Sequence, residues 1–214
     1  MESISTFFQF GGFWMYPILL MSIVGLAVIV ERFIFLHMRH NIDANALMSK
    51  ITDHVQTGQI PQALTVCASA QKSALARVLA AGLQNAAQGP EKIQNAIEEH
   101  ALEVSPEITK RGTLLQNIAN IATLLGLLGT ILGLIDAFSA LATVTDPELQ
   151  TKMLTNGISK AMNTTAFGLM VAIPCLFAHV MLSSITKKIL DEIEHNSVKL
   201  ENILVTRLQG EQGR

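Results

Sequence analysis

The chain has 214 residues, of which 50% are hydrophobic and only 15% carry a formal charge. A soluble domain usually has about 25% charged residues, so the composition excludes one large water-soluble core and favours a membrane protein with soluble extensions. The formal net charge of −2 gives no electrostatic basis for binding nucleic acid. We expect Cys67 and Cys175 to be reduced, and no Cys/His cluster has metal-ligand spacing, so neither a metal nor a cofactor is predicted.

The first uncharged run predicts a transmembrane helix over residues 13–36, after a periplasmic N-terminal segment at residues 1–12. No charged residue lies between Glu2 and Glu31, which is ample for a hydrocarbon core about 30 Å thick. A secretory signal peptide is the alternative. No Lys or Arg precedes the run, and no clear small-residue cleavage site follows it, so a retained span is favoured.

Residues 37–112 predict a cytoplasmic helical domain. Gly89-Pro90-Glu91 is a stop followed by a helix start, with Pro placed for a first helical turn. From there the helical pattern continues into the next apolar run. An unbroken helix from Glu91 to Val144 would be about 80 Å long, and Pro106 is the position at which it would kink.

Two further uncharged runs predict the second and third transmembrane helices, at residues 113–144 and 161–186. The second run has a single charge, Asp136, and the third has none. Helices are expected because lipid offers backbone groups no outside partner. We assign residues 145–160 to a periplasmic loop and residues 187–214 to an amphipathic cytoplasmic C-terminal helix. The predicted fold is therefore all-α, with three transmembrane helices and long cytoplasmic helical extensions.

The distribution of Lys and Arg predicts the orientation in the membrane. Residues 1–12 contain none and residues 145–160 contain two, whereas residues 31–117 contain eight and residues 185–214 contain five. The N-terminus and the short loop are therefore predicted to be periplasmic, and the C-terminus cytoplasmic.

Small and hydroxyl residues recur at steps of three and four in both later spans, so each set shares one helix face. In the second span they are Thr123, Gly126, Thr130, Gly133 and Ala137, and in the third Ala161, Thr165, Gly168, Ala172, Cys175 and His179. Such stripes let helices pack closely, as in the Gly129/Gly133 pair. They also suit a narrow polar path for a partner helix or water, and the residues alone leave both readings open.

Two ionisable residues inside the spans are candidate sites. A carboxylate within a span is costly and usually faces protein or water; for Asp136 the alternative is a solvated side chain near the mouth of the path. His179 is a candidate proton relay. The alternative is a histidine with a satisfied hydrogen bond near the inner interface.

Three segments resemble the signatures of the ExbB/TolQ family. Residues 124–133 (LLGLLGTILG) resemble its second-span pattern, and residues 157–174 (GISKAMNTTAFGLMVAIP) its third-span pattern. Met15-Tyr-Pro-Ile-Leu-Leu with Glu31-Arg32 looks like the first. MotA is less similar, because it has a fourth span.

The resemblance implies a homopentamer in the bacterial inner membrane whose second and third spans line a central pore. The pore would hold a single-span ExbD- or TolR-like partner that carries an essential Asp, and proton flow would drive a TonB-like or other periplasm-spanning protein. The family's pore threonines correspond to Thr130 and Thr165, with Gly126, Gly133, Gly168 and Ala172 on the same stripes. Two positions depart from the pattern: Lys160 replaces a family Glu, and Thr123 a common Pro.

We therefore interpret the chain as the stator-like proton-channel subunit of a motor driven by proton-motive force, in contact with membrane lipids. It would supply a hydroxyl-lined wall, while the partner supplies the titrating acid. No covalent chemistry is implied, so the chain is not expected to be an enzyme. A secondary transporter is disfavoured because no inverted repeat is present. A non-conducting scaffold that anchors a periplasmic or motility apparatus stays as the alternative.

A further hypothesis pairs Asp136 with Lys160, within or between subunits. Asp136 lies about 9 Å to the periplasmic side of Thr130, and Lys160 about 7.5 Å to that side of Thr165. If the threonines are level, the two charges are also nearly level. A pair relieves the cost of an isolated charge at that depth. Alternatively, Lys160 snorkels to the interface.

Overall fold

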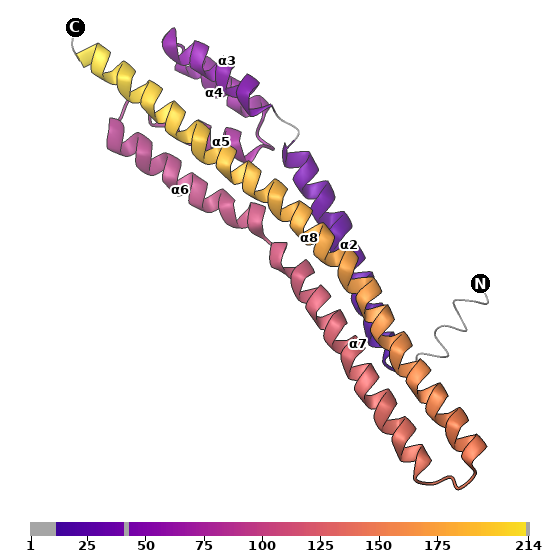
Figure 1. The fold of residues 1–214 in the computed structure, drawn as a ribbon. Helices are drawn as coiled ribbons and strands as arrows, with labels where there is room; N and C mark the ends of the chain where they lie inside the picture. Colours follow the sequence, from indigo (N-terminus) through magenta and orange to yellow (C-terminus); the bar gives the residue numbers. More distant parts are fainter. Residues whose placement is uncertain (1–11, 41–42, 213–214) are drawn as a thin grey trace. The chain divides into compact units, whose positions relative to one another are not determined.

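The structure is a computed structural model that describes residues 12–40 and 43–212. All regular elements in these residues are helices, which confirms the predicted all-α fold. In chain order they are α2 (Met15–His40), α3 (Ala44–Gln56), α4 (Ile60–Ser69), α5 (Ala74–Gln84), α6 (Pro90–Thr109), α7 (Gly112–Leu141) and α8 (Pro147–Gln212) (Figure 1). The predicted periplasmic N-terminal segment lies almost entirely outside the described residues.

Contacts divide the described chain into two compact units. The first, called the span unit, comprises the residues up to Glu31 together with Arg111–Met181. The second, called the polar unit, comprises Arg32–Lys110 and the chain from Leu182 onward. Each unit is described separately below.

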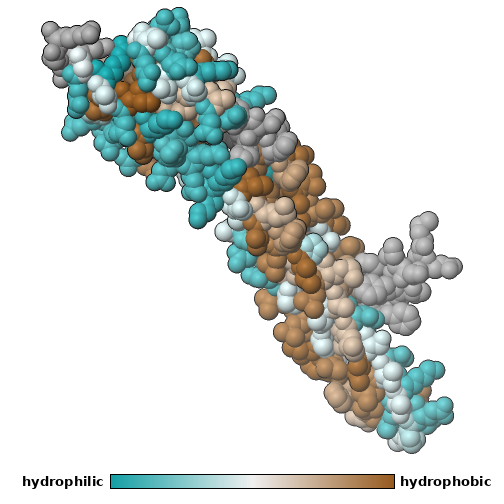
Figure 2. All heavy atoms as spheres, turned by 45° about the horizontal axis from the view of Figure 1, so that its top comes forward, coloured by the Kyte–Doolittle hydropathy of each residue, from teal (hydrophilic) through white to brown (hydrophobic). Residues whose placement is uncertain are grey.

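The span unit consists of most of α2, all of α7 and the first half of α8. Three helices of the described chain are long and apolar enough to cross a membrane, and each of them contributes to this unit. Large apolar side chains point outward, among them Leu124, Met162 and Phe177, which are 63%, 65% and 68% exposed. Figure 2 shows the resulting brown surface. Soluble proteins rarely expose such a large apolar area to water. Together with the three long apolar helices, this surface shows that the chain is a membrane protein.

Packing inside the span unit relies on small residues. Ile18 of α2, Ala122 of α7 and Val171 of α8 belong to one buried cluster. Gly25 lets α2 approach α8, since a Cβ on it would lie 2.9 Å from the Cys175 sulfur. The three helices therefore form a tight bundle.

The polar unit contains α3 to α6 and the end of α8, with the hydrophilic surface seen in Figure 2. Asp43 caps α3, where its carboxylate accepts from the N–H groups of Asn45 and Ala46 at 3.0 and 3.2 Å. The core is aliphatic and includes Leu79 and Leu204. Cys67 is also buried there, and both cysteines are free.

The chain between α6 and α7 is broken at Lys110 and Arg111, so the unbroken helix considered from sequence does not form. Lys110 is extended (φ −46°, ψ 135°) and Arg111 has a left-handed φ of 60°. Pro106 stays inside α6. Within the polar unit, the guanidinium of Arg32 donates to the Ile108 carbonyl at 2.5 Å, so this carbonyl has a partner near the end of α6.

The connection between α7 and α8 is short, at residues 142–146. Asp146 accepts from the Glu148 N–H at 3.0 Å and Pro147 occupies the first turn, so the helix starts there. Most of residues 145–160 is therefore helical, and α8 joins the third span and the predicted C-terminal helix into one element. The side of the membrane on which residues 147–160 lie stays a prediction.

Candidate functional site

The stripes of small residues bring the backbones of α7 and α8 into contact. A Cβ added to Gly168 would lie 2.7 Å from the Ala122 carbonyl oxygen and 3.1 Å from Gly126 Cα. A Cβ on Gly133 would lie 3.1 Å from the Ala161 Cβ. Gly126, Gly133, Gly168 and Ala172 are buried within one chain, so close packing is part of their role. Whether they also line a pore stays a prediction.

Two threonine hydroxyls meet where α7 contacts α8. The Thr130 and Thr165 oxygens contact each other. Thr130 Oγ1 is also 3.1 Å from the Gly126 carbonyl oxygen and 3.3 Å from that of Ala161, and Thr165 Oγ1 is 3.0 Å from the Gly126 oxygen. The two hydroxyls therefore share the Gly126 carbonyl and are level with each other, as the sequence hypothesis assumed.

The number of hydroxyl hydrogens determines how many hydrogen-bond donors and acceptors of this cluster remain available. Each hydroxyl has one proton and two lone pairs, whereas a carbonyl oxygen only accepts. The protons of Thr130 and Thr165 are directed to the carbonyls or to each other, and hydroxyl lone pairs remain. Both residues are only partly buried. The cluster is therefore a source of acceptors, which suits a water chain that carries a proton.

The hydroxyl pair lies on the side of α7 and α8 that faces away from α2. On α7, a Cβ at Gly129 would lie 3.4 Å from the Trp14 Cβ, so Gly129 faces the start of α2. Thr130 is turned by about 100° from it. On α8, Thr164 is 1% exposed and packs on Gly129. The sequence analysis did not select Thr164; only its place in the α7–α8 contact distinguishes it from its neighbour Thr165.

Asp136 and Lys160 lie on the α2 side instead. Asp136 is seven residues after Gly129 and therefore shares its face. The Lys160 side chain contacts Gly12, just before α2. Both residues are exposed, and the ion pairs among the described residues do not include one between them. The proposed pair of Asp136 and Lys160, within or between subunits, stays a prediction.

His179 of α8 has a defined hydrogen bond. Its Nδ1 lies 2.8 Å from the Gly112 carbonyl oxygen at the start of α7. Because a carbonyl only accepts, Nδ1 carries the hydrogen and Nε2 is left for any exchange. This contact matches the satisfied-histidine alternative, and a relay role stays a prediction.

Comparisons with known proteins give the context for this geometry. A family model described as the MotA/TolQ/ExbB proton channel family matches residues 70–195. The biopolymer transport protein ExbB-like 3 of Synechocystis sp. is 31% identical over 81% of this chain and 82% of its own length. ExbB-like 1 from the same organism is 31% identical over 90% of this chain and 76% of its own length. The Tol-Pal system protein TolQ of Haemophilus influenzae is 37% identical over 36% of this chain and 32% of its own length.

The chain belongs to the MotA/TolQ/ExbB proton channel family. The family match contains all of α7 and the membrane part of α8, and with them the hydroxyl pair. Members of the MotA/TolQ/ExbB family are channel and transport subunits of membranes. The family resemblance inferred from the three sequence signatures is thus confirmed. Separately, no cluster of three metal-binding side chains occurs among the described residues.

Proposed function

We propose that this chain is the channel subunit of an inner-membrane motor of the ExbB–ExbD or TolQ–TolR type. Several copies, five by resemblance, would surround a single-span partner. The N-terminus would be periplasmic and the C-terminus cytoplasmic. Proton flow through the assembly would drive a periplasm-spanning protein.

The hydroxyl pair of Thr130 and Thr165 is the observation that supports this proposal most. It lies on the side away from α2, where a partner helix has access to both α7 and α8. Neither helix has a carboxylate at this level; the nearest in the span, Asp136, is six residues further along and on another face. A wall of hydroxyl acceptors passes a proton along water without trapping it. The titrating acid would therefore come from the partner.

The test replaces each hydroxyl with a methyl group of similar size. A hydrogen bond to a charged species contributes about 1.5–3 kcal/mol, so Thr130→Val and Thr165→Val are each expected to lower proton flux about 10- to 100-fold. Flux is measured with a pH-sensitive dye in liposomes that contain the complex with its single-span partner. Thr164→Val is the matched control, because its hydroxyl bonds to the Lys160 carbonyl at 2.9 Å on the buried side.

If proton flux and assembly were unchanged in both variants, the two threonines would serve only in helix packing and not in conduction. An absence of flux through the wild-type complex would favour the non-conducting scaffold. Native mass spectrometry of the detergent-solubilised protein checks the assembly, and a monomer alone would contradict the oligomeric ring.

A further inference from the structure

A groove runs between α6 and α8 within the polar unit. It has a volume of about 620 Å³. Its walls are two stripes with spacings of four, three and four residues. One consists of Gln94, Glu98, Ala101 and Ser105, and the other of Leu190, Glu194, Ser197 and Glu201. Such spacing places each stripe along one face of its helix.

The floor and shoulders of the groove are apolar. Ile97 and Ile193 lie at its base and are 6% and 4% exposed. Leu102 on α6 and Val198 on α8 flank it and are 68% and 52% exposed. Both belong to the polar unit, where no lipid covering is predicted. Two large apolar side chains on the two sides of one groove therefore favour an occupant.

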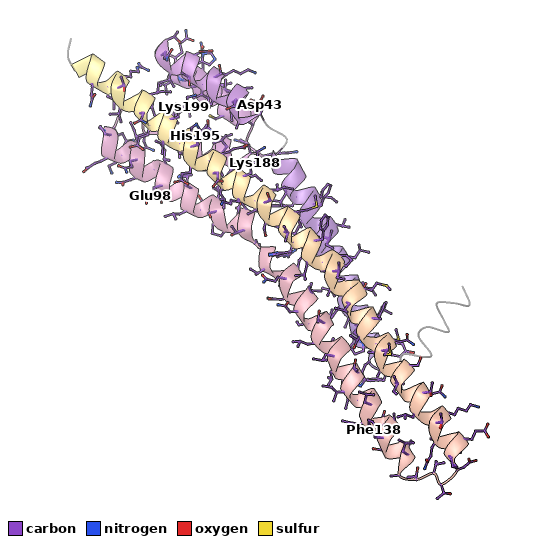
Figure 3. The ribbon with its side chains drawn as sticks, viewed as in Figure 1. Asp43, Glu98, Phe138, Lys188, His195 and Lys199 are labelled. Carbon is purple, nitrogen blue, oxygen red and sulfur yellow. The ribbon has the colours of Figure 1, made fainter. Side chains whose placement is uncertain are left out.

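The rim of the groove is acidic. Glu98, Glu194 and Glu201 line it, and no Lys or Arg is among the lining residues of the described chain. Two lysines of α8 near the groove, Lys188 and Lys199, lie nine residues before and two after Ser197, which puts them on the opposite side of the helix. Figure 3 shows them leaving α8 away from Glu98 of α6. The nearest lysine on the groove side is Lys187, one turn before Leu190.

Ser197 gives an independent sign of an occupant. This residue is 6% exposed, lines the groove, and its hydroxyl has no hydrogen-bond partner in the described structure. A buried hydroxyl without a partner is unfavourable. The Ser197 side chain would have to rotate toward the groove for a polar group on a bound helix to satisfy this hydroxyl.

We propose that this groove binds a basic amphipathic helix at the cytoplasmic end of the single-span partner. The inference rests on the proposed function, because that partner would cross the membrane with one end in the cytoplasm. Lys and Arg accumulate on the cytoplasmic flank of a span, and this is the charge that the rim of Glu98, Glu194 and Glu201 complements. The apolar face of the helix covers Leu102 and Val198, as in other helix-in-groove interfaces.

The experiment measures binding of a defined probe to the full-length protein in phosphatidylcholine nanodiscs. The probe is a fluorescein-labelled synthetic helix with Leu on one face and four flanking Lys; a second peptide has Glu in place of Lys. Fluorescence anisotropy is expected to show binding of the Lys peptide alone, weakening as salt rises. Empty nanodiscs correct for binding to lipid.

Variants then locate the site. Because one exposed charge pair changes an equilibrium about 1.5- to 5-fold, Glu98→Gln, Glu194→Gln and Glu201→Gln together are expected to weaken binding on the order of tenfold. The control removes three exposed carboxylates that do not line the groove, with Asp53→Asn, Glu103→Gln and Glu148→Gln, and changes the net charge equally. Equal weakening in both triple variants would overturn the proposal.

The unsatisfied hydroxyl gives a second readout. Ser197→Ala removes it without emptying space, so the thermal stability of the unbound protein is expected to be unchanged or higher, while affinity for the Lys peptide falls. A loss of stability with unchanged affinity would overturn the role of Ser197 in binding.

A second copy of this chain is the competing occupant. Leu102→Cys is oxidised in native membranes from cells that also express the partner; both native cysteines are buried and give little background. Disulfide-linked dimers of this chain, which Asp53→Cys on the exposed surface of α3 does not form, would overturn the proposal. If the peptide fails to bind while proton flux persists, the proposed binding groove is refuted and the proposed channel function stands. Peptide binding without proton flux through the wild-type complex counts against the proposed function alone.

Discussion

Replacing Gly168 with Ala tests the close contact between α7 and α8. The added Cβ would lie 2.7 Å from the Ala122 carbonyl oxygen, whereas ordinary contact begins at 3.4 Å, so the helices must separate by about 0.7 Å (3.4 − 2.7). A gap of this size forfeits about a quarter to a half of each dispersion contact it opens. Overpacking costs about 1–3 kcal/mol, and the better helix propensity of Ala offsets up to about 1 kcal/mol.

The expected net loss is about 1–2 kcal/mol, or a fall of about 2–8 °C in the unfolding midpoint for a chain of this length. Thermal unfolding of the detergent-solubilised protein, followed by circular dichroism, measures it. Gly112→Ala is the control, because a Cβ at Gly112 meets nothing within 4 Å. If Gly168→Ala were as stable as this control, the helices would not be in backbone contact at that level.

Three other predictions concern buried or charged groups. Arg32 is 4% exposed and donates to the Ile108 carbonyl, so Arg32→Gln is expected to lower the unfolding free energy by about 2–3 kcal/mol in a chemical denaturation series. Burial raises the pKa of the Cys67 thiol from 9.0 to about 11. Because the folded state holds this proton more tightly, stability is lost as pH rises from about 9 to 11, and Cys67→Ala should show a smaller fall over that window. If Asp136 and Lys160 pair, within or between subunits, exchanging the two residues should restore part of the function that Asp136→Asn or Lys160→Gln removes; no restoration would count against the pair.

The sequence by itself determined the three spans and the all-helical fold. A span needs about 20 uncharged residues in a row, which is a property of the chain in one dimension. Helix periodicity is equally local, and it was enough to put Thr130 with the small residues of its stripe, and Thr165 with those of the other. Helix rise gave the heights of Asp136 and Lys160 relative to the two threonines. That Thr130 and Thr165 are level with each other was an assumption, and their contact in the structure supports it.

Only the tertiary structure decided which atoms face each residue. The helix breaks at Lys110 and Arg111 and not at Pro106. Just before this break, Arg32, which is distant in sequence, donates to the Ile108 carbonyl at the end of α6. Gly133 belongs both to the stripe of Thr130 and to the Gly129/Gly133 pair, so spacing alone did not separate Gly129 from Thr130. In the structure Gly129 faces Trp14, whereas Thr130 faces Thr165. A stripe is about 100° wide, so sequence spacing cannot say which edge of it a third helix covers. The position of α2 decides which edge is covered. As a result, Asp136 and Lys160 lie on the α2 side of the bundle, and the hydroxyl pair of Thr130 and Thr165 does not.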